Sequence, residues 1–245
     1  MKKRIKRILL FILNTLLPPR CLICQTIVCD TNGLCADCFA KVHFLTDQSC
    51  PVCGRPYTFP VQKGENLICG KCLMNPPHFK YLKAVFAYDQ FSRNLILPFK
   101  HANRTEVVPY LSRLMFMRGR DLLSECDMII AVPLHWKRML KRKYNQSALL
   151  AVQLSKRSGK PFVNDVLVRV KNTASQGHKT HQERLENVKD AFQVRHSQSI
   201  QGKKIVLIDD VSTTGATFNE CARVLRQAGA VQVTALCIAR VCRFE

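Results

Sequence analysis

Short apolar runs alternate with amphipathic stretches through the last two thirds of this chain. Two stretches, residues 105–117 and 145–158, carry apolar positions at helical spacing, and we expect both to form helices. The apolar runs predict five strands, at residues 83–88, 128–132, 166–170, 204–208 and 231–239. Strands and helices in alternation predict an α/β fold whose mostly parallel sheet is covered on both faces. The ligand of such a sheet binds beyond the carboxyl ends of its strands.

The amino-terminal segment follows another pattern, because residues 1–20 hold Lys and Arg but no Asp or Glu. Their apolar side chains recur at helical spacing, which predicts a basic amphipathic helix that ends at Pro18 and Pro19. The apolar stretch is too short to span a bilayer. Two roles stay open for residues 1–17: contact with a membrane surface, or packing of the apolar stripe against the rest of the protein.

Length and charge narrow the class of protein. With 245 residues and 47% hydrophobic side chains, the chain can bury one substantial core and add a small accessory domain. Its 38 Lys and Arg against 17 Asp and Glu give a formal net charge of +21, which predicts polyanionic partners. Nucleic acid, anionic lipid and pyrophosphorylated substrates would all be attracted by this charge. The sequence does not locate a site for stacking on bases, because Trp136 is the single Trp and a buried ring would not be accessible.

Eight of the 13 cysteines form four CxxC pairs in the first third of the chain, a spacing that lets two thiolates converge on one metal ion. A disulfide framework is the alternative, but it is typical of secreted chains, and the first residues do not resemble an export signal. We therefore expect two structural zinc ions, each bound by four sulfurs. The predicted ligands are Cys21, Cys24, Cys35, Cys38, Cys50, Cys53, Cys69 and Cys72.

Spacing alone leaves open how these pairs share the two ions. Sequential sharing needs the shortest connections, while a crossed arrangement, or replacement of one ligand by Cys29 or His43, remains an alternative. The other cysteines lie in apolar contexts and are expected in the core; they are Cys126, Cys221, Cys237 and Cys242. Composition changes after Pro77, so we expect the basic helix at 1–20, the zinc-ribbon domain at 21–77 and a second domain at 78–245.

The most informative stretch is residues 206–217, where Asp209 and Asp210 follow an apolar run and precede a loop of Ser, Thr and Gly. Apolar positions at helical spacing then begin at Thr217 and stop at Gly229. The stretch therefore predicts a strand, a tight loop and a helix. Backbone N–H groups, hydroxyls and the helix dipole make such a loop a good binding site for a phosphate.

Two nucleotide motifs are missing from this stretch. It contains neither the Walker A pattern nor GxGxxG, which argues against an ordinary ATPase or NAD site. Two carboxylates beside a phosphate require sugar hydroxyls or Mg²⁺ between them, and a ribose 5-phosphate meets this requirement. The alternative is a plain turn whose Asp and Thr cap the helix. Burial of both aspartates in ion pairs would contradict the phosphosugar hypothesis.

The string from Asp209 to Thr217 resembles the phosphoribosyl pyrophosphate (PRPP) motif of type I phosphoribosyltransferases, which have a Rossmann-like α/β core. The resemblance implies that Asp209 and Asp210 are catalytic and hold the ribose hydroxyls, that residues 213–217 wrap the 5-phosphate, and that Mg²⁺ accompanies PRPP. The implied ribose and phosphate site is Asp209, Asp210, Val211, Ser212, Thr213, Thr214, Gly215, Ala216 and Thr217.

Two further segments are expected at the same edge of the sheet. The basic loop after residues 128–132 is expected to bind pyrophosphate, through Pro133, Leu134, His135, Arg138, Arg142 and Lys143. A polar stretch is expected to close over the reaction as a mobile hood, through Lys171, Thr173, Gln176, Arg184 and Asn187. His135 is a weak candidate for a general base, and capping a helix or lying in the core is the stronger expectation for it.

Together these segments resemble the competence protein F family, in which a double zinc ribbon precedes a phosphoribosyltransferase domain. The match covers nearly the whole chain and includes Phe99, Lys100 and residues 142–146. Lys143 departs from the pattern, because Gly is common at that position.

The resemblance implies a role in DNA uptake and natural transformation, in the cytoplasm or at the inner face of the membrane. We expect PRPP and single-stranded DNA as ligands, and a competence helicase or other uptake proteins as partners. We also expect phosphoribosyl transfer to an unknown acceptor. The alternative is a phosphoribosyltransferase of nucleotide or related metabolism that has no DNA role.

Overall fold

The structure, a computed structural model, describes residues 15, 17–29, 33–62, 67–101, 104–172 and 181–242. The helix expected over residues 1–20 therefore lies mostly outside the described residues. The described elements, in chain order, are α2 (Ala36–Ala40), α3 (Gly70–Met74), β1 (Leu82–Ala87), α4 (Arg93–His101), η1 (Thr105–Val107), α5 (Val108–Arg118), α6 (Arg120–Glu125), β2 (Met128–Ala131), α7 (Trp136–Arg142), α8 (Gln146–Ser158), β3 (Leu167–Arg169), α9 (His181–Val188), β4 (Phe192–Val194), η2 (Ser197–Ile200), β5 (Lys204–Ser212), α10 (Ala216–Gln227) and β6 (Gln232–Arg240).

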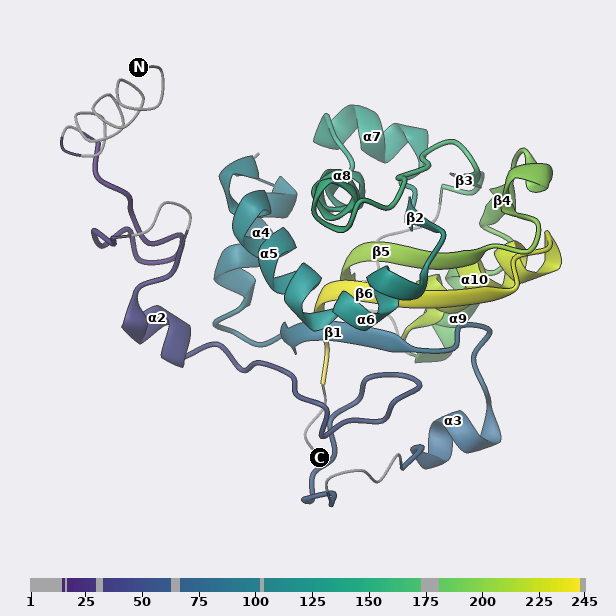
Figure 1. The fold of residues 1–245 in the computed structure, drawn as a ribbon, viewed down its shortest axis with the longest axis horizontal. Coiled ribbons are helices and arrows are strands. Elements are labelled where there is room, and N and C mark those ends of the chain that lie inside the picture. Colours follow the sequence, from purple (N-terminus) through teal and green to yellow (C-terminus); the bar gives the residue numbers. More distant parts are fainter. Residues whose placement is uncertain are drawn as a thin grey trace.

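Four parallel strands form the main sheet, in the order β1, β6, β5, β2 (Figure 1). This confirms the predicted α/β class, and these strands correspond to four of the five expected ones. The fifth, expected at residues 166–170, is β3, which pairs antiparallel with β4 in a separate hairpin. A short apolar run has the same pattern in either setting, so the sequence did not distinguish them.

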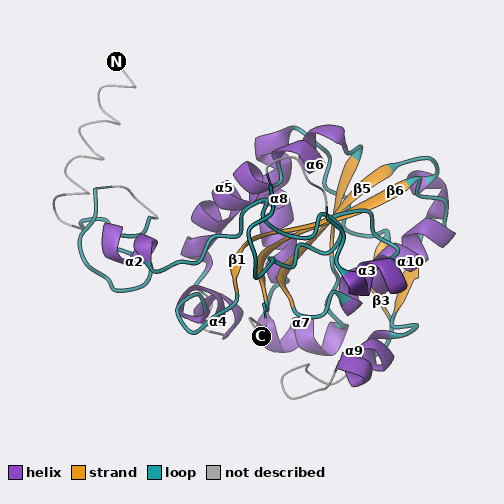
Figure 2. Cartoon of the chain, turned by 90° about the horizontal axis from the view of Figure 1, so that it is seen from below, coloured by secondary structure: helices purple, strands orange, loops and turns teal. Residues whose placement is uncertain are grey.

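Helices cover both faces of the main sheet, as predicted (Figures 1 and 2). Helices α4, α5, α6 and α8 pack on one face, while α10 and the β3–β4 hairpin pack on the other. Leu111 and Met115 of α5, with Leu150 and Leu154 of α8, are completely buried. Burial of a side chain of this size contributes about 1.5–3 kcal/mol, so this packing holds the sheet edge on which the site is built.

Strand β5 is longer than expected, because it continues past Ile208 to Ser212. Strand β6 runs beside it to Arg240, and the register pairs Asp209 with Cys237 and Ser212 with Arg240. The acidic pair therefore lies inside the strand rather than after it. Because side chains alternate along a strand, Asp209 and Asp210 point to opposite faces of the sheet.

The helices that flank the site begin where the sequence indicates. Asn145 caps α8, and its side chain accepts a hydrogen bond from the Ser147 N–H at 3.1 Å. Helix α10 begins after Gly215, whose φ of +83° lies in the left-handed region that favours glycine. This backbone turn redirects the chain from the end of β5 into α10, so the loop between them is only a few residues long.

The segment between the two cysteine-rich halves is attached to the edge of the sheet. Leu45 N–H donates to the Val85 carbonyl at 2.9 Å, and Ala87 N–H donates to the His43 carbonyl at 2.8 Å. Gly54, with a φ of +68°, lies so close to β1 that a Cβ there would be 2.5 Å from the Leu82 carbonyl oxygen. The second cysteine-rich half thus docks by backbone contact, and only glycine fits at this point.

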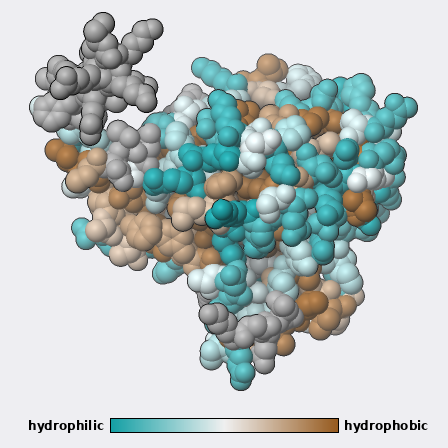
Figure 3. Space-filling model, in the orientation of Figure 1, coloured by the Kyte–Doolittle hydropathy of each residue, from teal (hydrophilic) through white to brown (hydrophobic). Residues whose placement is uncertain are grey.

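The cysteine-rich segment leaves large apolar side chains at its surface. Phe39 is 50% exposed on α2, and Leu73 and Met74 are 64% and 77% exposed on α3, where Figure 3 shows a patch of apolar surface. Leu22 and Val42 are the buried apolar residues that join this segment to the main core. Such a small core must be stabilised by metal.

Candidate functional site

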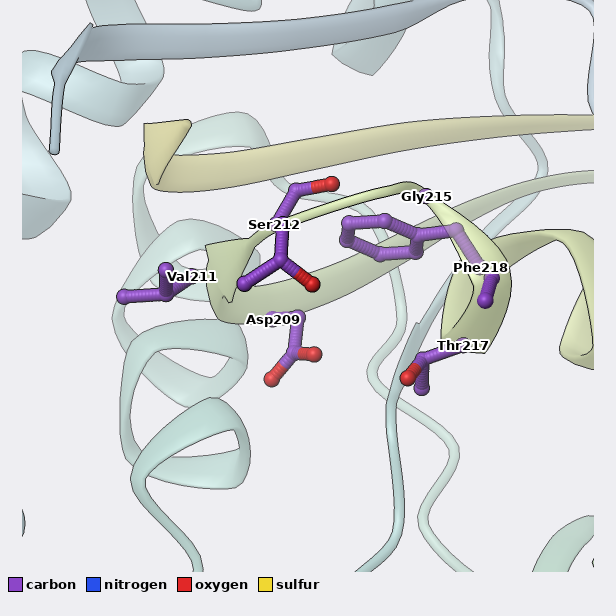
Figure 4. Close-up of a pocket in the computed structure, with 8 residues that line it drawn as sticks. Asp209, Val211, Ser212, Gly215, Thr217 and Phe218 are labelled. Atoms are coloured by element: carbon purple, nitrogen blue, oxygen red, sulfur yellow. The ribbon is translucent and has the colours of Figure 1, made fainter. Parts of the chain in front are cut away.

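The loop between β5 and α10 forms one wall of a pocket (Figure 4). In that view the Asp209 carboxylate and the Thr217 hydroxyl lie on the same side of the loop. The pocket is lined by Asp209, Val211, Ser212, Thr213, Gly215, Ala216, Thr217 and Phe218. Two residues of the implied site, Asp210 and Thr214, are not among them. Thr214 instead accepts a hydrogen bond from the Ala216 N–H at 3.3 Å, which closes a local turn before α10, whose N-cap is Gly215.

The two aspartates have different environments. Asp209 Oδ1 accepts hydrogen bonds from Ser147 Oγ at 2.7 Å and from the Asp210 N–H at 2.9 Å. Asp210 Oδ1 lies 3.1 Å from Lys100 Nζ, and only 10% of the Asp210 side chain is exposed. One aspartate is thus in a buried ion pair, whereas the ion pairs of the described residues do not include Asp209. The condition that would contradict a phosphosugar site is met by Asp210 alone.

The end of β2 explains how Ser147 reaches Asp209. Ala131, the last residue of β2, pairs with Ile208, so β2 supplies no neighbour to the next residue of β5. The first turn of α8 lies beside β5 at this point, and Ser147 in that turn donates its hydroxyl to the Asp209 carboxylate.

Asp209 has a perturbed protonation equilibrium. Burial raises the pKa of Asp209 to about 7, and the charge of Asp210 acts in the same direction. The hydrogen bond from Ser147 and the charge of Lys100 lower the pKa, but by less. Asp209 therefore exchanges a proton near neutral pH, which reduces the negative charge that a phosphate would meet.

Three arginines lie near one another, Arg138 and Arg142 on α7 and Arg169 at the end of β3, and the charge of Arg169 interacts with that of Asp209. Burial lowers the pKa of Arg138, and the charge of Arg142 lowers it further. Burial and the charge of Arg138 lower the pKa of Arg169, whereas Asp209 acts the other way. Cations that disfavour one another's charge in this way would be relieved by a polyanion.

Arg169 begins the polar stretch that was expected to form the hood, but it was not among the individual site residues predicted from the sequence. It belongs to a short apolar run that predicts a buried strand, and it is the one cation within residues 166–170. Its guanidinium lies 5.1 Å from the centre of the Phe192 ring on β4. A lone Arg in an otherwise apolar strand was the available signal.

Two of the remaining residues of the basic loop, His135 and Lys143, cap the two ends of α7. Pro133 and Leu134 are half-buried. His135 caps the helix, because its Nδ1 accepts from the Lys137 N–H at 3.4 Å, and its pKa is lowered by burial and by the charge of Lys137. This agrees with the capping role that was the stronger expectation. Lys143 ends α7 with a φ of +65°, which explains why Gly suits this position.

The hood is placed only in part. Thr173 and Gln176 lie outside the described residues, as does the side chain of Arg184. Lys171 Nζ donates to the Lys189 carbonyl at 3.1 Å, and Asn187 is half-buried on α9. Its closure over the site stays a prediction.

The eight predicted cysteine ligands form two clusters, and within each cluster the four sulfurs lie within 4.8 Å of one another. The clusters are Cys21, Cys24, Cys35 and Cys38, then Cys50, Cys53, Cys69 and Cys72. The chain thus has the sequential arrangement. Cys24 and Cys35 sulfurs are 3.6 Å apart, close to the roughly 3.8 Å between sulfurs around a tetrahedral zinc. Each set fits one structural zinc ion with no position left for water.

The alternative ligands lie elsewhere. Cys29 is exposed and belongs to neither cluster, and His43 Nδ1 lies 2.6 Å from Asp89 Oδ2. Cys126, Cys221 and Cys237 are buried, in agreement with the expected core role, and Cys242 is half-buried. Within the described part of the chain, no helix has the length and apolar character needed to cross a membrane.

Two families match this chain. Residues 12–73 match the double zinc ribbon domain, and residues 145–242 match the phosphoribosyl transferase domain. The chain therefore combines a double zinc ribbon with a type I phosphoribosyltransferase fold.

Named relatives are similar to this chain over most of their length. DNA utilization protein YhgH of Salmonella typhimurium is 33% identical over 229 residues, 91% of this chain and 97% of the relative. Competence protein F of Haemophilus influenzae is 32% identical over 90% of this chain and 96% of the relative. Competence protein ComFC of Bacillus subtilis is 27% identical over 80% of this chain and 79% of the relative. The chain belongs to the family of competence protein F and DNA utilization protein YhgH.

Solved phosphoribosyltransferases are more distant. Orotate phosphoribosyltransferase from Aeropyrum pernix is 17% identical with a TM-score of 0.37, covering 64% of this chain and 80% of that chain. A TM-score at this level carries no argument, and the fold assignment rests on the family matches and the sheet topology.

Proposed function

We propose that the pocket at the end of β5 binds PRPP, with the 5-phosphate in the loop of residues 213–217 and the ribose hydroxyls at the acidic pair. One observation carries the proposal: Asp209 lines the same pocket as this loop, and Arg169 lies close enough for its charge to interact with that of Asp209. PRPP has two separate anionic groups. The site offers two kinds of hydrogen-bond donor to anions, the backbone N–H groups at the start of a helix and the guanidinium groups of arginines. Because alternation along β5 turns the two aspartates to opposite faces and Asp209 is the one that lines the pocket, we expect Asp209 to accept directly from a ribose hydroxyl.

The same arrangement supports phosphoribosyl transfer. Ribose C1 loses its bond to the pyrophosphate oxygen, which keeps the electron pair, and C1 bonds to a nucleophile that gives up its proton. The arginines stabilise the charge on the departing pyrophosphate, and Asp209, fixed by Ser147, orients the ribose. Carboxylates of the acidic pair and pyrophosphate oxygens are ligands that suit Mg²⁺, which would neutralise part of the leaving group's charge.

Calorimetric titration of the zinc-loaded protein with PRPP, with and without Mg²⁺, tests this function. We expect binding that strengthens with Mg²⁺ and that Asp210→Asn weakens. Asp121→Asn is the matched control, because Asp121 on α6 forms a more exposed ion pair with Lys83 on β1. Absence of PRPP binding in the wild-type protein would contradict the proposal. Release of pyrophosphate after addition of an oligonucleotide would then separate an enzyme from a PRPP-binding protein.

We also propose that single-stranded DNA binds along α7. Trp136 is 60% exposed, and Lys137 Nζ lies 5.5 Å from the centre of its ring. An exposed aromatic ring flanked by cations favours stacking on bases together with contacts to phosphates. The net charge of +21 and the names of the relatives, which refer to DNA utilization and competence, support the same ligand.

Because Trp136 is the single Trp, its fluorescence reports directly on this surface. We expect an oligothymidylate to quench it, and the affinity to fall with salt at a slope of about −0.7 per phosphate contacted. Trp136→Ala should lower the affinity measured by anisotropy of a labelled oligonucleotide. Met117→Ala is the control, because Met117 is a similarly exposed apolar residue on α5. Unchanged fluorescence at saturating DNA would contradict binding along α7.

With these ligands, we propose that the protein acts in the cytoplasm or at the inner face of the membrane, where incoming DNA strands arrive. A competence helicase and other uptake proteins are the partners that this setting implies. Copurification from cells that are taking up DNA, compared with cells that are not, tests the association.

A further inference from the structure

Lys100 lies in the last turn of α4 and contacts the acidic pair. Its side chain is 19% exposed, and Nζ is 3.1 Å from Asp210 Oδ1. Among the described residues, Asp210 is the partner that the structure gives this ammonium group. An ammonium has three N–H donors, so donors remain for a ligand at the same place.

The segment of residues 142–147 holds this turn of α4 in place. Tyr144 Oη donates to the Phe99 carbonyl at 2.7 Å, and Gln146 Nε2 donates to the Lys100 carbonyl at 3.3 Å. These carbonyls belong to the last turn of a helix, where intrahelical donors are missing. Side chains from another element therefore fix the position of Lys100.

The same segment also contacts the other aspartate. Ser147 Oγ donates to Asp209, and Arg142, one of the three arginines of the site, donates to Gln146 Oε1 at 3.3 Å. Residues 142–147 thus position three groups: the Lys100 ammonium on Asp210, the Ser147 hydroxyl on Asp209, and the guanidinium of Arg142.

Stability alone does not account for a lysine at this position. Burying two charges costs desolvation energy that their attraction seldom exceeds, and an apolar pair of similar size serves a core equally well. An ion pair beside a site for anions has another use, because it cancels the negative charge of Asp210 where a polyanion must approach.

We infer that Lys100 is a ligand-binding residue of this site, whose ammonium stays on Asp210 and donates to the pyrophosphate group of bound PRPP. The inference rests on the proposed PRPP site and adds a cation to it. Residues 142–147 act as a clasp that positions this cation by holding the end of α4.

Titration with PRPP, inorganic pyrophosphate and ribose 5-phosphate tests the inference in wild-type protein and in Lys100→Met. We expect Lys100→Met to weaken PRPP and pyrophosphate binding about ten- to a hundredfold, the worth of one charge-assisted hydrogen bond, and to change ribose 5-phosphate binding little. Lys83→Met removes a partly exposed lysine from another ion pair and serves as the matched control.

A second variant tests the clasp. Tyr144→Phe should weaken PRPP binding several-fold in the wild-type background and have no effect when Lys100→Met is already present, since the clasp acts through Lys100. Equal losses in both backgrounds would assign Tyr144 a purely structural role and overturn this part.

The remaining outcomes are also decisive. Tighter PRPP binding by Lys100→Met would show that the ion pair blocks the site, and unchanged binding would show that it only supports the fold; either overturns the inference while the PRPP site stands. Wild-type protein that binds neither PRPP nor pyrophosphate would overturn the proposed function together with this inference.

Discussion

The Ser147 hydroxyl donates a 2.7 Å hydrogen bond to the Asp209 carboxylate, across the space left where β2 ends. This contact joins the first turn of α8 to β5 and favours the ionised form of the carboxyl group. Burial and Asp210 disfavour that form more strongly. The site therefore contains a carboxyl group that titrates near neutral pH and affects stability as well as binding.

We predict that Asp209→Asn stabilises the protein at about pH 7.5 and has less effect at about pH 5.5. The folded-state pKa of Asp209 is raised to about 7 from an ordinary value of 3.8, so folding between these values takes up a proton. The stabilising contribution of the protonated form is complete below about pH 4 and is lost as pH rises to about 7. An asparagine at this position does not titrate, so it avoids this loss of stability, and its side-chain oxygen can still accept the hydrogen bond from Ser147. Thermal unfolding measured at both pH values checks the prediction.

The groups that face Asp209 belong to several elements, and their charges enter this prediction. They are Asp210 on β5, Lys100 on α4, Arg169 on β3, Cys221 on α10 and Cys237 on β6. The control is Asp121→Asn, whose unfolding temperature should follow the wild-type curve at both values. Parallel curves for Asp209→Asn and the wild type would show that Asp209 titrates at its ordinary pKa.

Metal removal should unfold the cysteine-rich segment. The apparent binding free energy of a structural zinc is about 10–16 kcal/mol, far more than the small apolar core of this segment contributes. We expect metal analysis to find one zinc ion for each cluster, and Cys53→Ser to lose one of them. Cys29→Ser, outside both clusters, should keep both ions. Loss of zinc from Cys29→Ser would mean that the ligand sets differ from those in the structure.

Lys143→Gly should stabilise the protein by about 1 kcal/mol, because Lys143 has a φ of +65° and its side chain is exposed. Lys143→Ala keeps the unfavourable backbone conformation and should give no gain. Urea unfolding of the two variants makes the comparison. If Lys143 also binds pyrophosphate, both variants should lose PRPP affinity equally, because both lack the ammonium group.

Gly215→Ala should cost about 1–2 kcal/mol and weaken PRPP binding. The cost is conformational, since φ is +83° and an added Cβ would meet only the Phe79 ring, at 3.7 Å or more. Adjustment of the backbone would also disturb the phosphate loop. Gly70→Ala is the control, because Gly70 has an ordinary φ and open space around it. Unfolding and calorimetry on the same samples separate the two effects.

Local patterns predicted the parts of the site that depend on neighbouring residues. Helical spacing located α8, and the hydroxyl-rich string located the loop before α10. The extension of β5 was missed because Asp209 and Asp210 have low strand propensity, and only pairing with β6 overrides it. The hydrogen bonds of Tyr144 and Gln146 to α4 join segments about 45 residues apart, and such contacts leave no local pattern.

Backbone pairing between residues 43–45 and β1 has a consequence for cells that are short of metal. This segment connects the two cysteine clusters and caps the outermost strand of the main sheet. We expect zinc loss to detach this cap and to expose unpaired N–H and C=O groups, which favour pairing with other chains. We therefore expect the zinc supply to determine how much of the protein stays monodisperse.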